Sequence, residues 1–172
     1  MIRKIYYTWH DIEKAVNDIV IQLYKDNWTP DYIVGITRGG LTPAVLLSHL
    51  LDIPMYTLKV SLDNGEELDC DHNCWMSEDA FGYRDGIKNI LIIDDINNGG
   101  STIAWIKQDW NSTCLPDDPK WETVWGQNVR FAAVVNNLAS KESVNYSSIE
   151  INKSEEPCWI TFPWEDWNKP RP

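Results

Sequence analysis

The sequence has no long apolar run and little positive charge. None of its hydrophobic stretches approaches the roughly 18 residues that a membrane span needs. Lysine and arginine number 15 against 26 aspartates and glutamates, which gives a net charge of -11 at pH 7. Long nucleic acids are therefore disfavoured as ligands, because their affinity comes mostly from basic side chains on phosphates. We expect neither a membrane nor a nucleic-acid polymer among the partners.

Cysteine is scarce, and the N-terminus lacks the features of a secretory signal. Residues 1–7 carry two positive charges but no long apolar region and no small-residue cleavage site. The four cysteines are therefore expected to be reduced thiols rather than a disulfide framework, and a cytoplasmic location is the default. With 172 residues and no repeat, low-complexity run or linker, the chain is expected to form a single domain, 1–172.

Apolar strands alternate with helices along most of the chain. Thr8 and Asp11 have the spacing of a capping box, and apolar residues at helical spacing follow to about Asn27. Further helices are expected at 42–51 and 102–110, and strands or extended segments at 32–36, 54–60, 90–93, 129–135 and 158–165. This alternation predicts an α/β fold: a central, mainly parallel sheet flanked by helices, with its site at the carboxyl edge.

Two stretches show no such pattern. Residues 61–86 are acidic, glycine- and cysteine-containing, and are expected to form a long mobile loop, functional or disordered. Residues 111–127 are expected to form an irregular excursion. Within the first stretch, Cys70, His72 and Cys74 could contribute to a zinc site, although a fourth ligand would have to come from elsewhere; the alternative is a loop of reduced thiols. His10 and His49 are expected to be packing or surface residues of helices.

The expected strand 90–93 ends in two carboxylates, Asp94 and Asp95, followed by a polar, glycine-rich turn. The backbone N–H groups of residues 97–102 can converge on an anion, and Ser101 or Thr102 could cap the next helix. This loop therefore offers carboxylates to hydroxyls or a metal, and amides to a phosphate. A solvated strand end is the alternative when the two carboxylates are considered alone.

A second strand-to-loop junction follows the strand 32–36. The loop runs from Thr37 to Gly40, and Thr42 and Pro43 supply an expected cap and first-turn proline for the next helix.

Both junctions resemble known motifs. Residues 88–102 are similar to the phosphoribosyl diphosphate signature of type I phosphoribosyltransferases, and residues 34–44 resemble the diphosphate loop of the bacterial xanthine-guanine branch. The resemblance extends to Thr8-Trp9 and to 159–164, with extra length in 61–86 and 111–128.

The resemblance implies transfer of a phosphoribosyl group from phosphoribosyl diphosphate to a purine-type base such as xanthine, guanine or hypoxanthine, with Mg²⁺ bridging substrate oxygens. Asp94 and Asp95 would accept hydrogen bonds from the ribose hydroxyls and serve as metal ligands. Thr37, Arg38 and Gly39 would hold the diphosphate, at a peptide that is often cis in the family. The 5-phosphate would lie on Asn98, Gly99, Gly100, Ser101 and Thr102. Catalytic roles would fall to Asp94, Asp95, Asn98 and Arg38.

The base site implied by the resemblance lies in a small C-terminal hood, 138–172. Trp159 would stack on the base, with a core tryptophan as the alternative, and Ile160 would read the base edge through its backbone. Asn137 and Glu165 complete the expected base contacts. The 61–86 segment would close over the reaction as a lid.

The sequence departs from the family pattern at three places. Purine enzymes of the family carry an aspartate where this chain has Asn98, which cannot act as an acid or base at neutral pH. They carry a lysine where this chain has Asn137, and a Ser-Tyr pair where it has Ser61-Leu62. The alternative function is therefore a catalytically impaired regulator that binds phosphoribosyl diphosphate or a nucleotide. A weaker third reading is an interaction protein with a tryptophan-rich surface. By analogy, a homodimer or homotetramer is expected.

Overall fold

A six-stranded sheet forms the centre of the computed structural model, which describes residues 2–165. Its strand order is β4-β3-β2-β5-β6-β7, and every neighbouring pair is parallel except β3 with β4. The strands are β2 (Tyr32–Thr37), β3 (Met55–Asp63), β4 (Glu66–Cys70), β5 (Ile90–Asn97), β6 (Val129–Asn137) and β7 (Tyr146–Ile151). The predicted α/β class with a mainly parallel sheet is confirmed.

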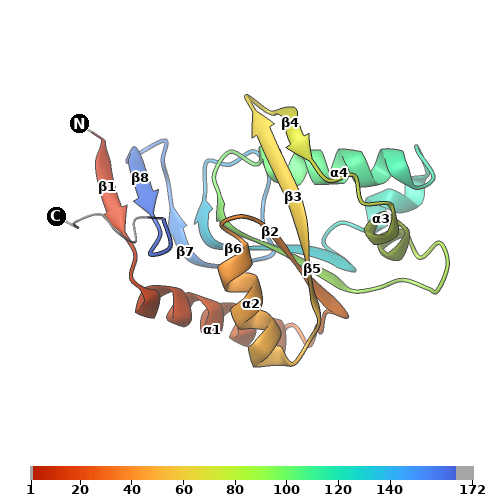
Figure 1. Ribbon diagram of the computed structural model, residues 1–172, viewed down its shortest axis with the longest axis horizontal. Helices are drawn as coiled ribbons and strands as arrows, with labels where there is room; N and C mark the ends of the chain where they lie inside the picture. The colour runs from red at the N-terminus through yellow and green to blue at the C-terminus, as the bar shows by residue number, and fades with distance from the viewer. Residues whose placement is uncertain (1, 166–172) are drawn as a thin grey trace.

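Helices cover both faces of this sheet, as Figure 1 shows. The helices α1 (Trp9–Lys25) and α2 (Leu41–Leu51) pack on one face, and α3 (Cys74–Phe81) and α4 (Ser101–Thr113) pack on the other. A hydrophobic core lies on each face of the sheet, and alternate residues of the central strands point into one core or the other. Ile33 packs in the core with α1 and α2, and Val34 packs in the core with α3 and α4. Burial on both faces explains why β2 and β5 are continuous apolar runs. No helix among residues 2–165 is long and apolar enough to span a membrane.

Helix starts agree only in part with the prediction. The capping box is present: Thr8 Oγ1 accepts a hydrogen bond from Asp11 N at 3.1 Å, and Asp11 Oδ2 accepts one from Thr8 N at 2.8 Å. The other predicted caps are wrong. α2 begins at Leu41 and α4 at Ser101, and neither helix has a side-chain cap. Gly100 precedes α4 with φ of 89°, a left-handed conformation that glycine adopts without steric cost.

The prediction of an irregular loop over 61–86 is wrong. β3 and β4 form a hairpin whose turn residues, Asn64 and Gly65, both have positive φ, at 49° and 83°. Such a turn matches the twist of paired strands, and Asn-Gly is its preferred sequence. α3 then begins after Asn73, whose Oδ1 accepts a hydrogen bond from Met76 N at 3.1 Å. Met76, Ala80 and Phe81 of α3 are buried in the core, so this part of the segment belongs to the packed domain.

The hood differs from the predicted span of 138–172. β7 belongs to the central sheet, because it pairs in parallel with β6. The separate small sheet joins the two ends of the chain: β1 (Arg3–Tyr6) pairs in parallel with β8 (Cys158–Thr161). Both strands lie beyond β7 at one end of the molecule (Figure 1). Residues 166–172 of the expected hood lie outside the described residues.

The excursion after α4 contributes to the core. A 3-10 helix, η1 (Pro119–Thr123), buries Trp121, whose Nε1 donates a hydrogen bond to the carbonyl of Cys114 at 2.8 Å. The ring of Trp121 stacks on that of Trp125 with centroids 5.6 Å apart. Several of the many tryptophans therefore serve packing.

Candidate functional site

Asp94 and Asp95 lie near the end of β5, three and two residues before its last residue, Asn97. The two carboxylates are held by backbone amides: Asp95 N donates to Asp94 Oδ1 at 2.9 Å, and Ile96 N donates to Asp95 Oδ1 at 2.7 Å. Burial raises the pKa of both carboxyls, and the charge of Asp95 raises the pKa of Asp94 further. The negative charge of Glu165 also raises the pKa of Asp95. A cation or hydroxyl donors would stabilise the charged form of these two carboxyls.

The loop after β5 and the start of α4 surround a cavity of about 200 Å³. The polar residues that line it are Asp94, Asn97, Asn98, Gly99, Gly100, Ser101 and Thr102. The predicted phosphate-loop residues are thus brought together in space. A helix N-terminus presents unpaired backbone N–H groups and the positive end of the helix dipole, which together favour an anion.

Asn97 holds the loop after β5 in place through its side-chain hydrogen bonds, a role that the sequence analysis did not predict. The side chain is buried, and its Nδ2 donates to Asn136 Oδ1 at 3.0 Å and to the carbonyl of Glu142 at 2.8 Å. Its Oδ1 accepts a hydrogen bond from Ser140 Oγ at 3.1 Å. The loop after β5 is therefore fixed against the segment that follows β6. An asparagine in a turn-rich stretch gave no signal for these distant partners.

The loop after β2 faces the same carboxylates. The peptide between Thr37 and Arg38 is cis, as the resemblance implies. Gly39 lies directly against the Asp95 carboxylate. A cavity of about 550 Å³ is lined by Arg38, Gly39, Asp95, Trp164 and Glu165. Arg38 is exposed and forms no ion pair with any residue between 2 and 165, so its guanidinium is available for an anion.

A third cavity, of about 210 Å³, lies between the loop after β5 and the small terminal sheet. Its lining residues are Asp95, Ile96, Asn98, Lys153, Trp159, Ile160, Phe162 and Glu165. Trp159 is 63% exposed, which contradicts the alternative that it is a core residue. Glu165 is fixed by a hydrogen bond that its carboxylate accepts from Phe162 N at 2.8 Å. Three of the four predicted base-site residues thus share one cavity.

Asn137, the fourth, does not line this cavity. Its side chain is 7% exposed, and both ends of the amide are occupied. Nδ2 donates to the carbonyl of Asn98 at 2.8 Å, and Oδ1 accepts from Lys153 N at 3.0 Å and Ala139 N at 3.3 Å. The expected base contact of Asn137 is not supported by this geometry. Lys153, which does line the cavity, was missed by the sequence reasoning.

The possible zinc site at Cys70, His72 and Cys74 is contradicted. No three His, Cys, Asp or Glu side chains within the described part of the chain converge as metal ligands. Instead, His72 Nδ1 lies 2.6 Å from Asp109 Oδ1 and His72 Nε2 lies 2.8 Å from Glu67 Oε1. These hydrogen bonds raise the pKa of His72. The imidazole therefore links β4 to α4.

The three cavities are contiguous, because Asp95 lines two of them and Asn98 lines two. The site thus combines a helix N-terminus, paired carboxylates, a free arginine and an exposed tryptophan along one edge of the sheet. This arrangement defines an α/β protein whose candidate ligand site lies at the carboxyl ends of its strands.

Comparison with known proteins identifies the family. The model of the phosphoribosyl transferase domain matches residues 3–165, so the chain belongs to the phosphoribosyltransferase family. The chain is 30% identical over 141 residues to the xanthine-guanine phosphoribosyltransferase of Cereibacter sphaeroides, covering 81% of this chain and 72% of that protein. It is 23% identical over 166 residues to the enzyme of the same name from Idiomarina loihiensis, covering 95% and 88%.

Solved structures share the fold. A purine phosphoribosyltransferase from Pyrococcus horikoshii matches with a TM-score of 0.67 at 24% identity, covering 98% of this chain and 99% of that one. The xanthine-guanine-hypoxanthine phosphoribosyltransferase of Helicobacter pylori matches with a TM-score of 0.66 at 18% identity, covering 95% of each chain. The type I phosphoribosyltransferase fold predicted from the sequence is confirmed.

Proposed function

We propose that this chain transfers the phosphoribosyl group from phosphoribosyl diphosphate to a purine-type base and releases diphosphate. The observation that carries the proposal is the contiguity of the three cavities: Asp95 lines the cavities of the arginine loop and of Trp159, and Asn98 lines those of Trp159 and of the phosphate loop. Membership of the family supports the same reaction class.

The residues act by positioning and by electrostatics. Amides at the start of α4 and the hydroxyls of Ser101 and Thr102 hold the 5-phosphate. Asp94 and Asp95 accept hydrogen bonds from the ribose hydroxyls, and Arg38 matches two diphosphate oxygens with its planar guanidinium. Holding the base against the anomeric carbon makes the displacement effectively unimolecular, which can remove several kcal/mol from the barrier.

Magnesium fits the donor set of this site. Mg²⁺ prefers oxygen ligands and is commonly bound through one or two carboxylates together with substrate phosphates. Asp94 and Asp95 supply two adjacent carboxylates, and burial, the largest cause, raises the pKa of both. When bound, the ion would neutralise the developing charge of the diphosphate leaving group.

The rival function is a regulator that binds phosphoribosyl diphosphate or a nucleotide without turnover. Asn98 lines both the phosphate cavity and the base cavity, and its amide cannot exchange a proton with the base at neutral pH. An interaction protein without a ligand is the third reading, and Arg38, which lines the same cavity as Asp95, argues against it. We propose the enzyme because the chain belongs to the phosphoribosyltransferase family.

One experiment separates these functions. Calorimetry with phosphoribosyl diphosphate and Mg²⁺ measures binding, and diphosphate release is then measured across a panel of purine and pyrimidine bases. Binding with release supports the transferase. Binding without release for any base supports the regulator, and no heat at millimolar ligand rejects both.

Location and assembly remain proposals. The cysteines are free thiols in the structure (Cys70, Cys74, Cys114 and Cys158), which accords with a reducing, cytoplasmic location. We propose a homodimer or homotetramer by analogy with the family. Sedimentation or light scattering of the purified chain measures its mass directly.

A further inference from the structure

We propose that Asn97 and Ser140 are positioning residues for phosphate binding: they fix the loop after β5 in the shape that holds a phosphate monoester and thereby set its affinity. The proposal rests on the proposed function and adds to it two residues that act through the loop. Residues 97–102 line the phosphate cavity. The loop between β6 and β7, residues 138–145, is connected to them in three ways.

The first connection is the side chain of Asn97, which is only 6% exposed. Its Nδ2 donates to Asn136 Oδ1 at 3.0 Å and to the carbonyl of Glu142 at 2.8 Å, and its Oδ1 accepts from Ser140 Oγ at 3.1 Å. One buried amide thus joins β5 to β6 and to the β6–β7 loop. Both of its N–H donors are used within the protein, so Asn97 acts on an anion through the position of the loop rather than by contact.

The second connection is made by the glycines of the phosphate loop. The N–H of Lys141 donates to the carbonyl of Gly99 at 3.3 Å. Gly100 packs against the same segment, because a Cβ on it would lie 2.7 Å from Glu142 N and 2.9 Å from Ser140 Oγ. The β6–β7 loop is therefore packed on two successive residues of the phosphate loop, and neither loop can shift without moving the other.

The third connection reaches the helix that follows the phosphate loop. Lys107 of α4 donates through Nζ to Glu142 Oε2 at 2.7 Å, and both side chains are half-buried. The phosphate loop and the helix that begins at Ser101 are thus held by the same three residues, 140–142. A loop that is already fixed in its binding shape loses less conformational entropy when the ligand binds, and this raises the affinity.

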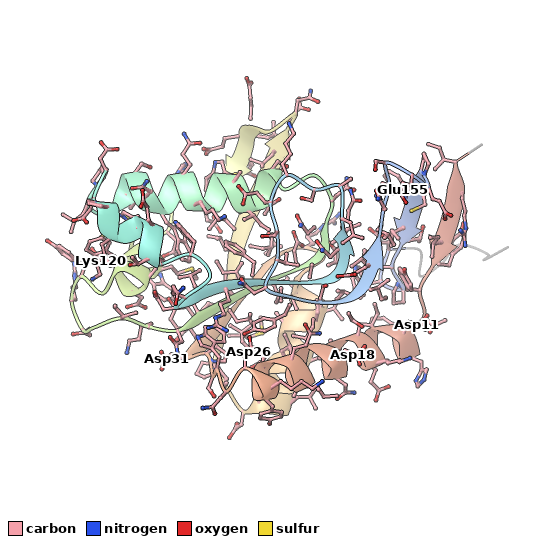
Figure 2. All side chains as sticks on the ribbon, turned by 180° about the vertical axis from the view of Figure 1, so that it is seen from behind. Asp11, Asp18, Asp26, Asp31, Lys120 and Glu155 are labelled. Carbon is pink, nitrogen blue, oxygen red and sulfur yellow. The ribbon has the colours of Figure 1, made fainter. Side chains whose placement is uncertain are left out.

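The test compares two serine variants that make the same chemical change. Ser140→Ala removes the hydroxyl that donates to Asn97, and Ser148→Ala removes a hydroxyl that donates to Asp18 Oδ2 at 2.6 Å. Both serines are half-buried. Figure 2 shows Asp18 on α1, across the sheet from α4. Urea unfolding of both variants measures the purely structural contribution of each hydroxyl, which should be similar.

The ligands are ribose 5-phosphate, which presents a phosphate monoester, and inorganic diphosphate with Mg²⁺, which is proposed to bind the Arg38 loop. Calorimetry measures both Kd values. We expect Ser140→Ala to raise the Kd of ribose 5-phosphate about threefold to tenfold, the range for one uncharged hydrogen bond, and to leave that of diphosphate unchanged. Ser148→Ala should change neither Kd. Asn97→Ala should raise the Kd of ribose 5-phosphate further, and Ser140→Ala should then add little, because the serine acts through Asn97.

Each outcome decides the proposal, and the serine pair decides it alone if Asn97→Ala does not fold. An unchanged Kd of ribose 5-phosphate in Ser140→Ala overturns it, even where stability falls. An equal loss for both ligands, or in both serine variants, also overturns it.

The proposed function can fail separately. A wild type that binds diphosphate but not ribose 5-phosphate overturns the positioning role and leaves the transferase to the panel of bases. A wild type that binds neither ligand overturns both. A wild type whose affinity for ribose 5-phosphate depends on Ser140, but which releases no diphosphate with any base, retains the positioning role and rejects only the transferase.

Discussion

Gly39, in the loop after β2, lies so close to the Asp95 carboxylate in β5 that a Cβ on Gly39 would overlap the carboxylate oxygens. Gly39 and Asp95 are 56 residues apart in the sequence, yet the diphosphate-loop motif and the ribose motif touch at this point. Because β2 and β5 are neighbouring parallel strands, their carboxyl ends must lie at the same edge of the sheet. The contact explains why a residue without a side chain is needed beside the carboxylate.

Gly39→Ala should therefore displace Asp95 and weaken the binding of phosphoribosyl diphosphate. Overpacking of this kind costs about 1–3 kcal/mol of the free energy of unfolding. We expect at least a tenfold rise in the Kd, measured by calorimetry with Mg²⁺ present. In Gly39→Ala/Asp95→Ala the overlap is relieved, so stability should return while binding stays weak. Unchanged binding in Gly39→Ala would show that Asp95 does not contact the ligand.

Arg38→Gln should weaken ligands that carry a diphosphate and spare those that do not. Arg38 lines the 550 Å³ cavity and has no partner among the described residues, so its removal leaves no protein group unpaired. We expect the Kd of phosphoribosyl diphosphate to rise roughly 10- to 100-fold, because two charge-assisted hydrogen bonds are lost. The Kd of guanosine 5-monophosphate, which lacks the diphosphate, is the control. A parallel loss for both ligands would contradict the assignment.

The sequence predicted those parts of the fold and the site that depend on local pattern. The continuous apolar residues of β2 and β5 indicated buried parallel strands. The polar residues directly after each run then indicated the loops at the carboxyl ends of these strands. β7 was not predicted, because its sequence, Tyr-Ser-Ser-Ile-Glu-Ile, is half polar and it lies at the edge of the sheet. The Asn64-Gly65 hairpin had a recognisable signal, which the acidic composition of its surroundings obscured.

The base site could be predicted only in part, because some of its contacts join residues that are far apart in the sequence. Trp159 and Glu165 lie in the C-terminal motif and were named from it, and the structure places both at one cavity. Asn137 was expected to contact the base because it stands where the family carries a lysine. Its real partners, the carbonyl of Asn98 and the N–H of Lys153, are 39 and 16 residues away in the sequence. Only tertiary structure reveals that its amide is already occupied.

Trp159→Ala should impair base binding without destabilising the fold. The indole is 63% exposed, so its removal forfeits little packing, and the free energy of unfolding should change by less than about 0.5 kcal/mol. Stacking of an aromatic ring on a base contributes about 1–3 kcal/mol, so the Kd of guanosine 5-monophosphate should rise about tenfold or more. Trp75→Ala, at an indole that is 43% exposed and packs on Tyr56, is the matched control and should leave that Kd unchanged.

The contribution of His72 to stability should depend on pH. The hydrogen bonds to Asp109 and Glu67 raise the pKa of the imidazole in the folded state. A raised pKa means that the folded state holds the proton more tightly, so the stabilisation is complete below the unfolded pKa of about 6.5 and is lost as pH rises through the higher folded value. His72→Gln should therefore cost about 1 kcal/mol at pH 6 and less at pH 9, measured by urea unfolding.

His10→Gln is the control for this measurement, because His10 is exposed in the first turn of α1. The difference between wild type and His10→Gln should show no comparable change between pH 6 and pH 9. A constant difference between wild type and His72→Gln across this range would mean that the imidazole stabilises only in its neutral form, or not at all.

Asn98→Asp should show whether turnover is limited by a missing proton donor or acceptor. Asn98 is exposed and lines the cavity shared with Trp159 and Lys153, while its backbone carbonyl is held by Asn137. A carboxylate here could exchange a proton with the base, an effect that contributes about 10²- to 10⁴-fold in enzymes. If the wild type is a slow transferase, the variant should raise kcat for diphosphate release with a smaller change in KM for phosphoribosyl diphosphate. If kcat is unchanged or falls while both ligands still bind, the asparagine is part of a working site, and proton transfer at this position does not limit the reaction.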